Sequence, residues 1–132
     1  RPAAPAHRAE RVFLALGGLG GLIAVAAGAM GAHLLQPRLD TPRLLAFDTA
    51  TRYLMIHALT LLVLAALQQG ALASRYFLWA GWCVAVGILL FSGSLYFRAL
   101  TGIPAGVVAP AGGMLLMAGW VCCIVGALAR GR

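Results

Sequence analysis

The sequence predicts an all-α integral membrane protein, an up-down bundle of four helices with both termini in the cytoplasm. Three observations predict this fold. The 132 residues are 62% hydrophobic with a mean hydropathy of +0.93, whereas about half of the residues of a soluble domain are apolar. Four long apolar stretches are separated by short polar loops. The ten basic residues, all of them arginine, flank those stretches, as is typical of membrane proteins.

The net charge of +7 does not indicate a nucleic-acid partner, because the arginines are dispersed between apolar stretches and form no basic patch. The three cysteines, Cys83, Cys122 and Cys123, lie inside apolar stretches and lack metal-binding spacing. We therefore expect free thiols and no nucleic acid.

Residues 1–11 carry two prolines and no apolar periodicity, so we expect a flexible arm, followed by one transmembrane domain at residues 12–132. The first span is predicted at about residues 12–35, longer than the roughly 20 residues that a bilayer requires. Its small residues fall on one helical stripe, the pattern that lets membrane helices approach closely, and we expect this stripe to pack within the chain. The stripe consists of Gly17, Gly21, Ala24, Gly28 and Ala32.

The second span is predicted at about residues 50–69. Thr41 and Pro42 indicate a helix start, with Thr41 as the N-cap and proline in the first turn. The apolar run at residues 54–67 is short for a span, so we expect the helix to begin outside the bilayer and to enter it near Tyr53. His57 would then lie about one turn inside the membrane.

The third and fourth spans are predicted at about residues 76–98 and 107–128. Trp79 and Trp82 are typical interfacial aromatic residues near the start of the third span. The fourth span has its own stripe of small residues. That stripe consists of Gly112, Gly119, Cys123 and Gly126.

The distribution of arginine predicts the orientation. Six arginines lie on the side of the termini and four on the other side, so the positive-inside rule places both termini in the cytoplasm.

Alternating helix directions bring most of the polar residues to the outer, non-cytoplasmic side. We expect them within about two helical turns of that boundary, whereas the cysteines and tryptophans lie in the cytoplasmic half. This polar outer cluster consists of His33, Asp48, Arg52, Tyr53, His57, Ser92, Ser94, Tyr96 and Arg98. Its simplest interpretation is a satisfied polar cap that fixes helix register. A binding site is the alternative.

Several segments resemble the YgdD-like family of small bacterial inner-membrane proteins. They are Gly28-Ala-Met-Gly-Ala-His33, the stretch from Phe47 to Leu59, Phe91-Ser-Gly-Ser-Leu-Tyr96 through Gly102, and Pro110-Ala-Gly-Gly113 through Trp120. The resemblance covers roughly residues 12 to 128. It implies four spans in the inner membrane and an uncharacterised function, with eukaryotic transmembrane relatives, and it supplies no activity, ligand or partner.

We find no catalytic motif, so the sequence predicts a non-enzymatic protein without cofactor. A hydrolase using Ser92 or Ser94 with His57 and Asp48 would lack the strand-turn-helix elbow of such enzymes. The leading hypothesis is an accessory subunit that packs against other integral membrane subunits, or against itself, in lipid. One alternative is a redox protein whose His33 and His57 ligate haem or a metal. The other binds a lipid or small solute at the outer cluster through Arg52 and Arg98.

Overall fold

The computed structural model describes residues 5–130 of the chain, with side chains from residue 8 onward. Its elements are α1 (Pro5–Met30), η1 (Gly31–Leu35), α2 (Thr41–Leu67), α3 (Arg75–Thr101) and α4 (Val108–Ala129). The π-helical η1 continues α1 without a break. Within the described residues there is no strand, which confirms the predicted all-α class.

Two helices begin earlier than the sequence predicted. The arm expected at residues 1–11 is helical from Pro5 on, and residues 1–4 lie outside the described range. The N-cap of α2 is Asp40, not Thr41, because the Asp40 carboxylate accepts the backbone N–H of Arg43 at 3.1 Å. Aspartate and threonine both cap helices, and the shift of one residue still leaves proline in the first turn.

The third helix has a defined cap at each end. The Ser74 hydroxyl oxygen accepts the backbone N–H of Tyr76 at 3.1 Å, and the helix ends where Gly102 adopts a φ of 77°. Its N–H donates to the carbonyl of Arg98 at 2.8 Å. Glycine adopts this left-handed conformation without strain, so it stops the helix here.

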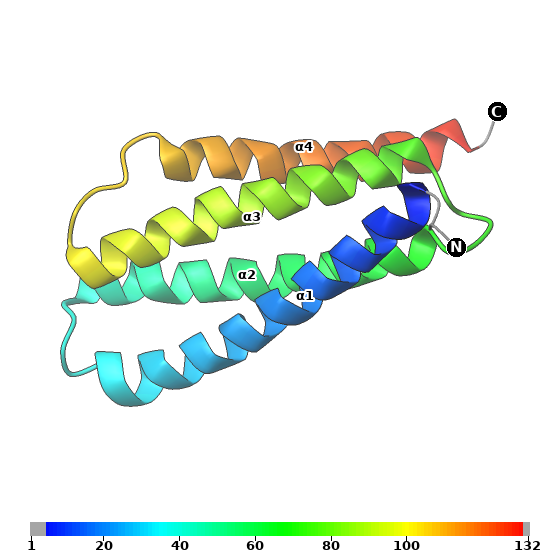
Figure 1. Cartoon of the computed structure of the whole chain (residues 1–132). Coiled ribbons are helices and arrows are strands. Elements are labelled where there is room, and N and C mark those ends of the chain that lie inside the picture. Colours follow the sequence, from blue (N-terminus) through cyan, green and yellow to red (C-terminus); the bar gives the residue numbers. More distant parts are fainter. Residues whose placement is uncertain (1–4, 131–132) are drawn as a thin grey trace.

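The helices lie in space in the order of the chain. Successive helices run antiparallel, and α1 packs on α2, α2 on α3, and α3 on α4 (Figure 1). Near its start α1 also touches α3, where the buried Phe13 contacts Gly81 and its ring lies 5.2 Å from that of Trp82. Within residues 5–130, α1 and α4 share no backbone contact. The bundle is therefore open, with α1 and α4 at its edges.

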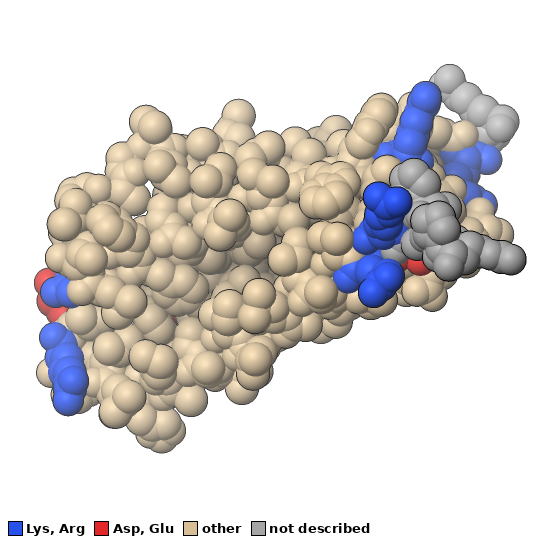
Figure 2. Space-filling model, viewed as in Figure 1, with Lys and Arg blue, Asp and Glu red and all other residues tan. Residues whose placement is uncertain are grey.

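We call the end where α1 begins and α4 ends the terminal end, and the opposite end the distal end (Figure 1). In the described part of the chain, four helices are long and apolar enough to cross a membrane. At about 1.5 Å per residue, the 27 residues of α2 and of α3 exceed the thickness of a hydrocarbon core. Figure 2 shows charged side chains at the two ends and almost none between them.

Glycines bring α3 and α4 into backbone contact. A Cβ atom added at Gly112 would overlap the backbone nitrogen of Phe91 and lie 2.8 Å from the Gly87 carbonyl oxygen. One added at Gly119 would lie 2.9 Å from Val84. Gly126 is buried against Phe77. The small-residue stripe of α4 thus faces α3.

The interface between α1 and α2 uses Gly17 and the buried Ala24 of the predicted stripe, together with Gly20, which the prediction omitted. A Cβ at Gly17 would lie 2.7 Å from Leu62, and one at Gly20 would lie 3.1 Å from Ala58. At Gly21 and Gly28 an added Cβ would meet no atom within 4 Å, so their predicted packing within the chain is wrong. Glycine and alanine occupy two neighbouring stripes of α1 at helical spacing, and the periodicity alone could not choose between them.

Candidate functional site

An arginine of α2 binds the end of α3. The Arg43 Nε–H donates to the carbonyl of Ala99 at 2.7 Å, and its Nη2 donates to the carbonyl of Leu100 at 3.1 Å. The last carbonyls of a helix have no partner within the helix, so this guanidinium caps α3 and fixes the start of α2 against it. The predicted cluster included Arg98 and omitted Arg43.

Further along α2, towards the terminal end, a hydrogen bond between two hydroxyl groups joins α2 to α3. The Thr51 hydroxyl donates to the carbonyl of Phe47 at 3.0 Å, so its oxygen accepts the phenol O–H of Tyr96 at 2.8 Å. The Tyr96 ring also lies edge-on to Phe47, with centroids 5.0 Å apart. Tyr96 belongs to the predicted cluster, whereas its partner Thr51 does not.

The two predicted serines bond to backbone. Ser92 is buried and donates to the carbonyl of Ala50 on α2 at 2.8 Å. Ser94 donates to the carbonyl of Phe91 in its own helix at 2.9 Å. Neither hydroxyl contacts His57 or Asp48 within the described hydrogen bonds, so the arrangement does not form a hydrolase triad.

His57 is the polar centre of the bundle, and it is 4% exposed. Its Nδ1–H donates to the carbonyl of Tyr53 at 2.8 Å, because a carbonyl can only accept. Nε2 is then an acceptor, and it receives the indole N–H of Trp120 on α4 at 3.2 Å. The Tyr53 ring stacks on the imidazole, with centroids 5.9 Å apart. His57 thereby links α2 to α4, two helices that share no backbone contact within the described chain.

The level of this group along the bundle is given by its place on α2. His57 lies sixteen residues into α2, about 24 Å along the helix axis, and five residues beyond the exposed Arg52. Trp120 was expected in the cytoplasmic half, yet it reaches the same level. The prediction placed the membrane boundary at Tyr53 because of the charged residues before it. In the structure α2 is packed against α3 from Arg43 onward.

The remaining members of the predicted cluster do not join this group. Arg52 Nη2 donates to Asp48 at 2.6 Å, and the two side chains are 68% and 62% exposed. Such a pair at i,i+4 contributes about 0.3–0.5 kcal/mol. Arg98 and His33 are exposed at the distal end, and in the described part of the chain no hydrogen bond or ion pair joins Arg98 to Asp48.

The two histidines proposed as ligands lie at different depths. The exposed His33 lies two residues after Gly31, which packs against Phe47 on α2. Phe47 precedes His57 by ten residues, or about 15 Å along the axis of α2. Both ring nitrogens of His57 already form hydrogen bonds. This geometry does not fit ligation of haem or a metal by His33 and His57. In residues 8–130 no three His, Cys, Asp or Glu side chains gather as a metal site.

The terminal end has contacts that the sequence did not indicate. The Gln68 side-chain oxygen accepts the backbone N–H of Ser74 at 2.9 Å, closing the loop between α2 and α3. Arg130 Nη1 donates to the carbonyl of Ala71 at 3.1 Å. Glu10 is buried and 5% exposed. These contacts tie the loop and the end of α4 together.

We expect Arg43→Ala to lower the free energy of unfolding by about 1–2 kcal/mol, because two charge-assisted hydrogen bonds to the end of α3 are lost. Thermal unfolding in detergent micelles, followed by circular dichroism, measures the change. Arg98→Ala removes an exposed arginine from the same end and should change the free energy by less than about 0.5 kcal/mol. Equal losses in the two variants would contradict the capping role of Arg43.

The fold defines a small multi-pass membrane protein. Residues 27–113 match a family described as "Protein of unknown function (DUF423)". The chain is 40% identical over 119 residues to a UPF0382 membrane protein of Staphylococcus epidermidis (strain ATCC 12228 / FDA PCI 1200), covering 89% of this chain and 96% of the relative. It is 38% identical over 119 residues to the UPF0382 membrane protein YwdK of Bacillus subtilis (strain 168), covering 89% and 97%.

The chain therefore belongs to this DUF423 family of uncharacterised membrane proteins. The match confirms the resemblance to a family of small membrane proteins of unknown function. No solved structure matches the chain significantly.

Proposed function

We propose that this protein is a non-enzymatic accessory subunit that packs against another integral membrane protein through α1. The open glycine face of α1 carries this proposal. At Gly18, Gly21 and Gly28 an added Cβ would meet no atom within 4 Å. Membrane helices associate through such small residues, because they let two backbones approach closely.

The position of α1 supports the same proposal. Helix α1 lies at one edge of the open bundle, and along most of its length it packs on α2 alone. The large side chains beside the open glycines project outward, with Leu22 68% and Val25 63% exposed. Ridges flanking a glycine groove are a surface into which another helix fits.

The state of the polar residues supports a non-enzymatic role. Ser92, Tyr96, His57 and Arg43 each bond to a backbone carbonyl or to a side chain of a neighbouring helix. These bonds give the polar groups a structural use, since an unpaired polar group inside a bilayer is costly. These four side chains join helices, and their hydrogen bonds do not place a nucleophile next to a base.

Purification from native membranes in a mild detergent tests the proposal. We expect another membrane protein to copurify with the wild type and to be lost from a Gly21→Leu/Gly28→Leu variant. Gly93→Leu on α3 is the matched control, because an added Cβ there also meets open space, and it should retain the partner. A lone wild-type monomer would contradict the proposal, and so would a second copy of the chain as the sole partner.

We further infer that both termini lie in the cytoplasm. In the sequence, six arginines and one acidic residue flank the spans on the side of the termini, and four arginines and two acidic residues flank them on the other side. A fluorescent protein fused after the last residue should fluoresce, and alkaline phosphatase fused there should be inactive. The opposite result would reverse the orientation.

A further inference from the structure

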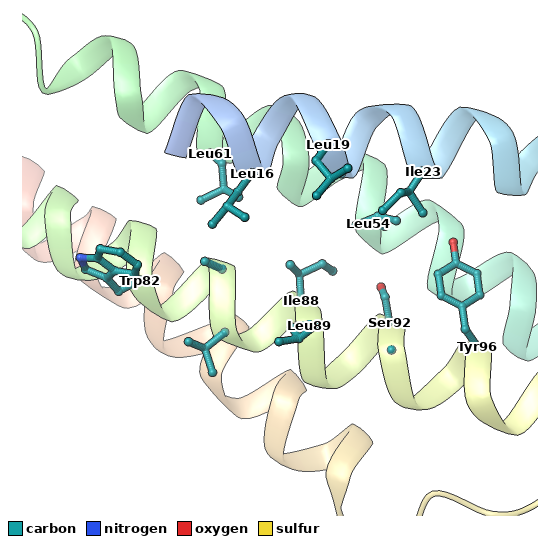
Figure 3. A pocket seen from close by; sticks show the side chains of 14 residues that line it. Leu16, Leu19, Ile23, Leu54, Leu61, Trp82, Ile88, Leu89, Ser92 and Tyr96 are labelled. Atoms are coloured by element: carbon teal, nitrogen blue, oxygen red, sulfur yellow. The ribbon is translucent and has the colours of Figure 1, made fainter. Parts of the chain in front are cut away.

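A lateral groove lies between α1 and α3, with α2 as its floor, on the side of α1 away from its open glycines. Its volume is about 390 Å³. Leu16, Leu19 and Ile23 project from α1 towards a wall formed by α3 between Trp82 and Tyr96 (Figure 3). That wall is about 21 Å long at 1.5 Å per residue.

The groove is apolar and open to the bilayer. Leu19 is 52% exposed and Leu89 on the opposite wall is 71% exposed. The polar atoms that reach it are already bonded, since Ser92 donates to Ala50 and Tyr96 pairs with Thr51. Its chemistry therefore suits an extended hydrocarbon chain.

On α1 and on α3, the helix face that lines the groove continues beyond it, towards the terminal end, to an arginine. On α3, the lining residues of this face repeat at steps of three and four. They are Trp82, Val86, Leu89, Gly93 and Tyr96, and the same spacing continues outside the groove to Trp79 and Arg75. On α1 the lining residues are Leu16, Leu19 and Ile23, and the same spacing continues outside the groove to Val12 and Arg8. Arg8 and Arg75 thus lie on the faces that line the groove, about 10–12 Å beyond its last lining residues towards the terminal end.

Both of these arginines, Arg8 and Arg75, are exposed. The Arg75 guanidinium lies over the rings of Tyr76 and Trp79, at 5.3 and 5.8 Å from their centroids. These ring contacts hold its charge at the helix surface. Figure 2 shows basic side chains gathered at this end of the molecule.

We propose that the groove holds one acyl chain of an anionic phospholipid whose phosphate is bound by Arg8 and Arg75. Guanidinium groups bind phosphate oxygens in pairs, and both helices begin at this end, where their dipoles favour a negative charge. Trp79 and Trp82 lie at the level where the glycerol region would sit. This site uses the wall of α1 that the proposed partner face does not use.

Native mass spectrometry of the full chain, titrated with phosphatidylglycerol or phosphatidylcholine, tests the head-group site. We expect the wild type to prefer phosphatidylglycerol. The Arg8→Gln/Arg75→Gln variant should bind it roughly 30-fold more weakly. Arg38→Gln/Arg98→Gln makes the same change of charge at the distal end and should weaken binding less than about two-fold.

A second variant tests the groove itself. Leucine at position 93 should fill the groove without disturbing the backbone, because an added Cβ at Gly93 meets no atom within 4 Å. We expect Gly93→Leu to remove the bound lipid and Gly21→Leu, on the other side of α1, to retain it. Unchanged lipid preference in the double arginine variant, or unchanged binding in Gly93→Leu, would show annular lipid only and overturn the proposal.

Discussion

Replacing Gly112 by valine is expected to lower the free energy of unfolding by about 3 kcal/mol, the upper part of the range for overpacked cores. The new Cβ would overlap the backbone of Phe91 on α3, which cannot move aside as a flexible side chain can. The helices would have to separate and lose contact along α3 and α4. Denaturation in mixed micelles, followed by circular dichroism, measures the loss.

Gly113→Val is the matched control for this prediction. It makes the same change of residue one position along α4, where an added Cβ would lie 3.7 Å from a side-chain atom of Phe91. That is ordinary van der Waals contact, so we expect a loss of less than about 1 kcal/mol. Equal losses in the two variants would attribute the effect to valine in the helix instead of to the α3–α4 contact.

The second large effect is expected for His57→Ala, at about 2–3 kcal/mol of unfolding free energy. The indole N–H of Trp120 loses its acceptor inside a spanning segment, where lipid offers no replacement, and a polar group left without a partner away from water costs about 1–3 kcal/mol. The stacked ring beside Tyr53 is lost as well. Intrinsic fluorescence should report the changed environment of Trp120.

Two further variants separate the hydrogen bond from the loss of volume. His57→Gln keeps an acceptor for Trp120 and should recover part of the stability. His33→Ala removes an exposed histidine and should change stability by less than about 0.5 kcal/mol. A His57→Ala variant as stable as His33→Ala would contradict the structural role of His57.

The fold could be predicted from the sequence because hydropathy and loop length determine it. Four apolar stretches joined by short loops have few arrangements other than an up-down bundle. The choice of helix face could not be predicted for α1. Gly20 and Gly21 are adjacent, and only the packed structure places the first against Ala58 and leaves the second open.

The polar residues that join the helices could be predicted only in part, and the reason is similar. His57, Ser92 and Tyr96 are conspicuous in apolar stretches, so the sequence identified them. Their partners Thr51 and Trp120 are ordinary residues of membrane helices, and they meet the group across 45 and 63 residues of chain. No local pattern encodes such a contact.

Photocrosslinking in native membranes tests most directly whether α1 faces a protein partner. A photoreactive phenylalanine analogue at Gly21 has room to be accommodated, since an added Cβ there meets no atom within 4 Å. We expect it to form an adduct with another polypeptide. The same analogue at Val63, a 57% exposed residue of α2, should react with lipid alone. Lipid adducts alone at Gly21 would contradict the proposed role as an accessory subunit.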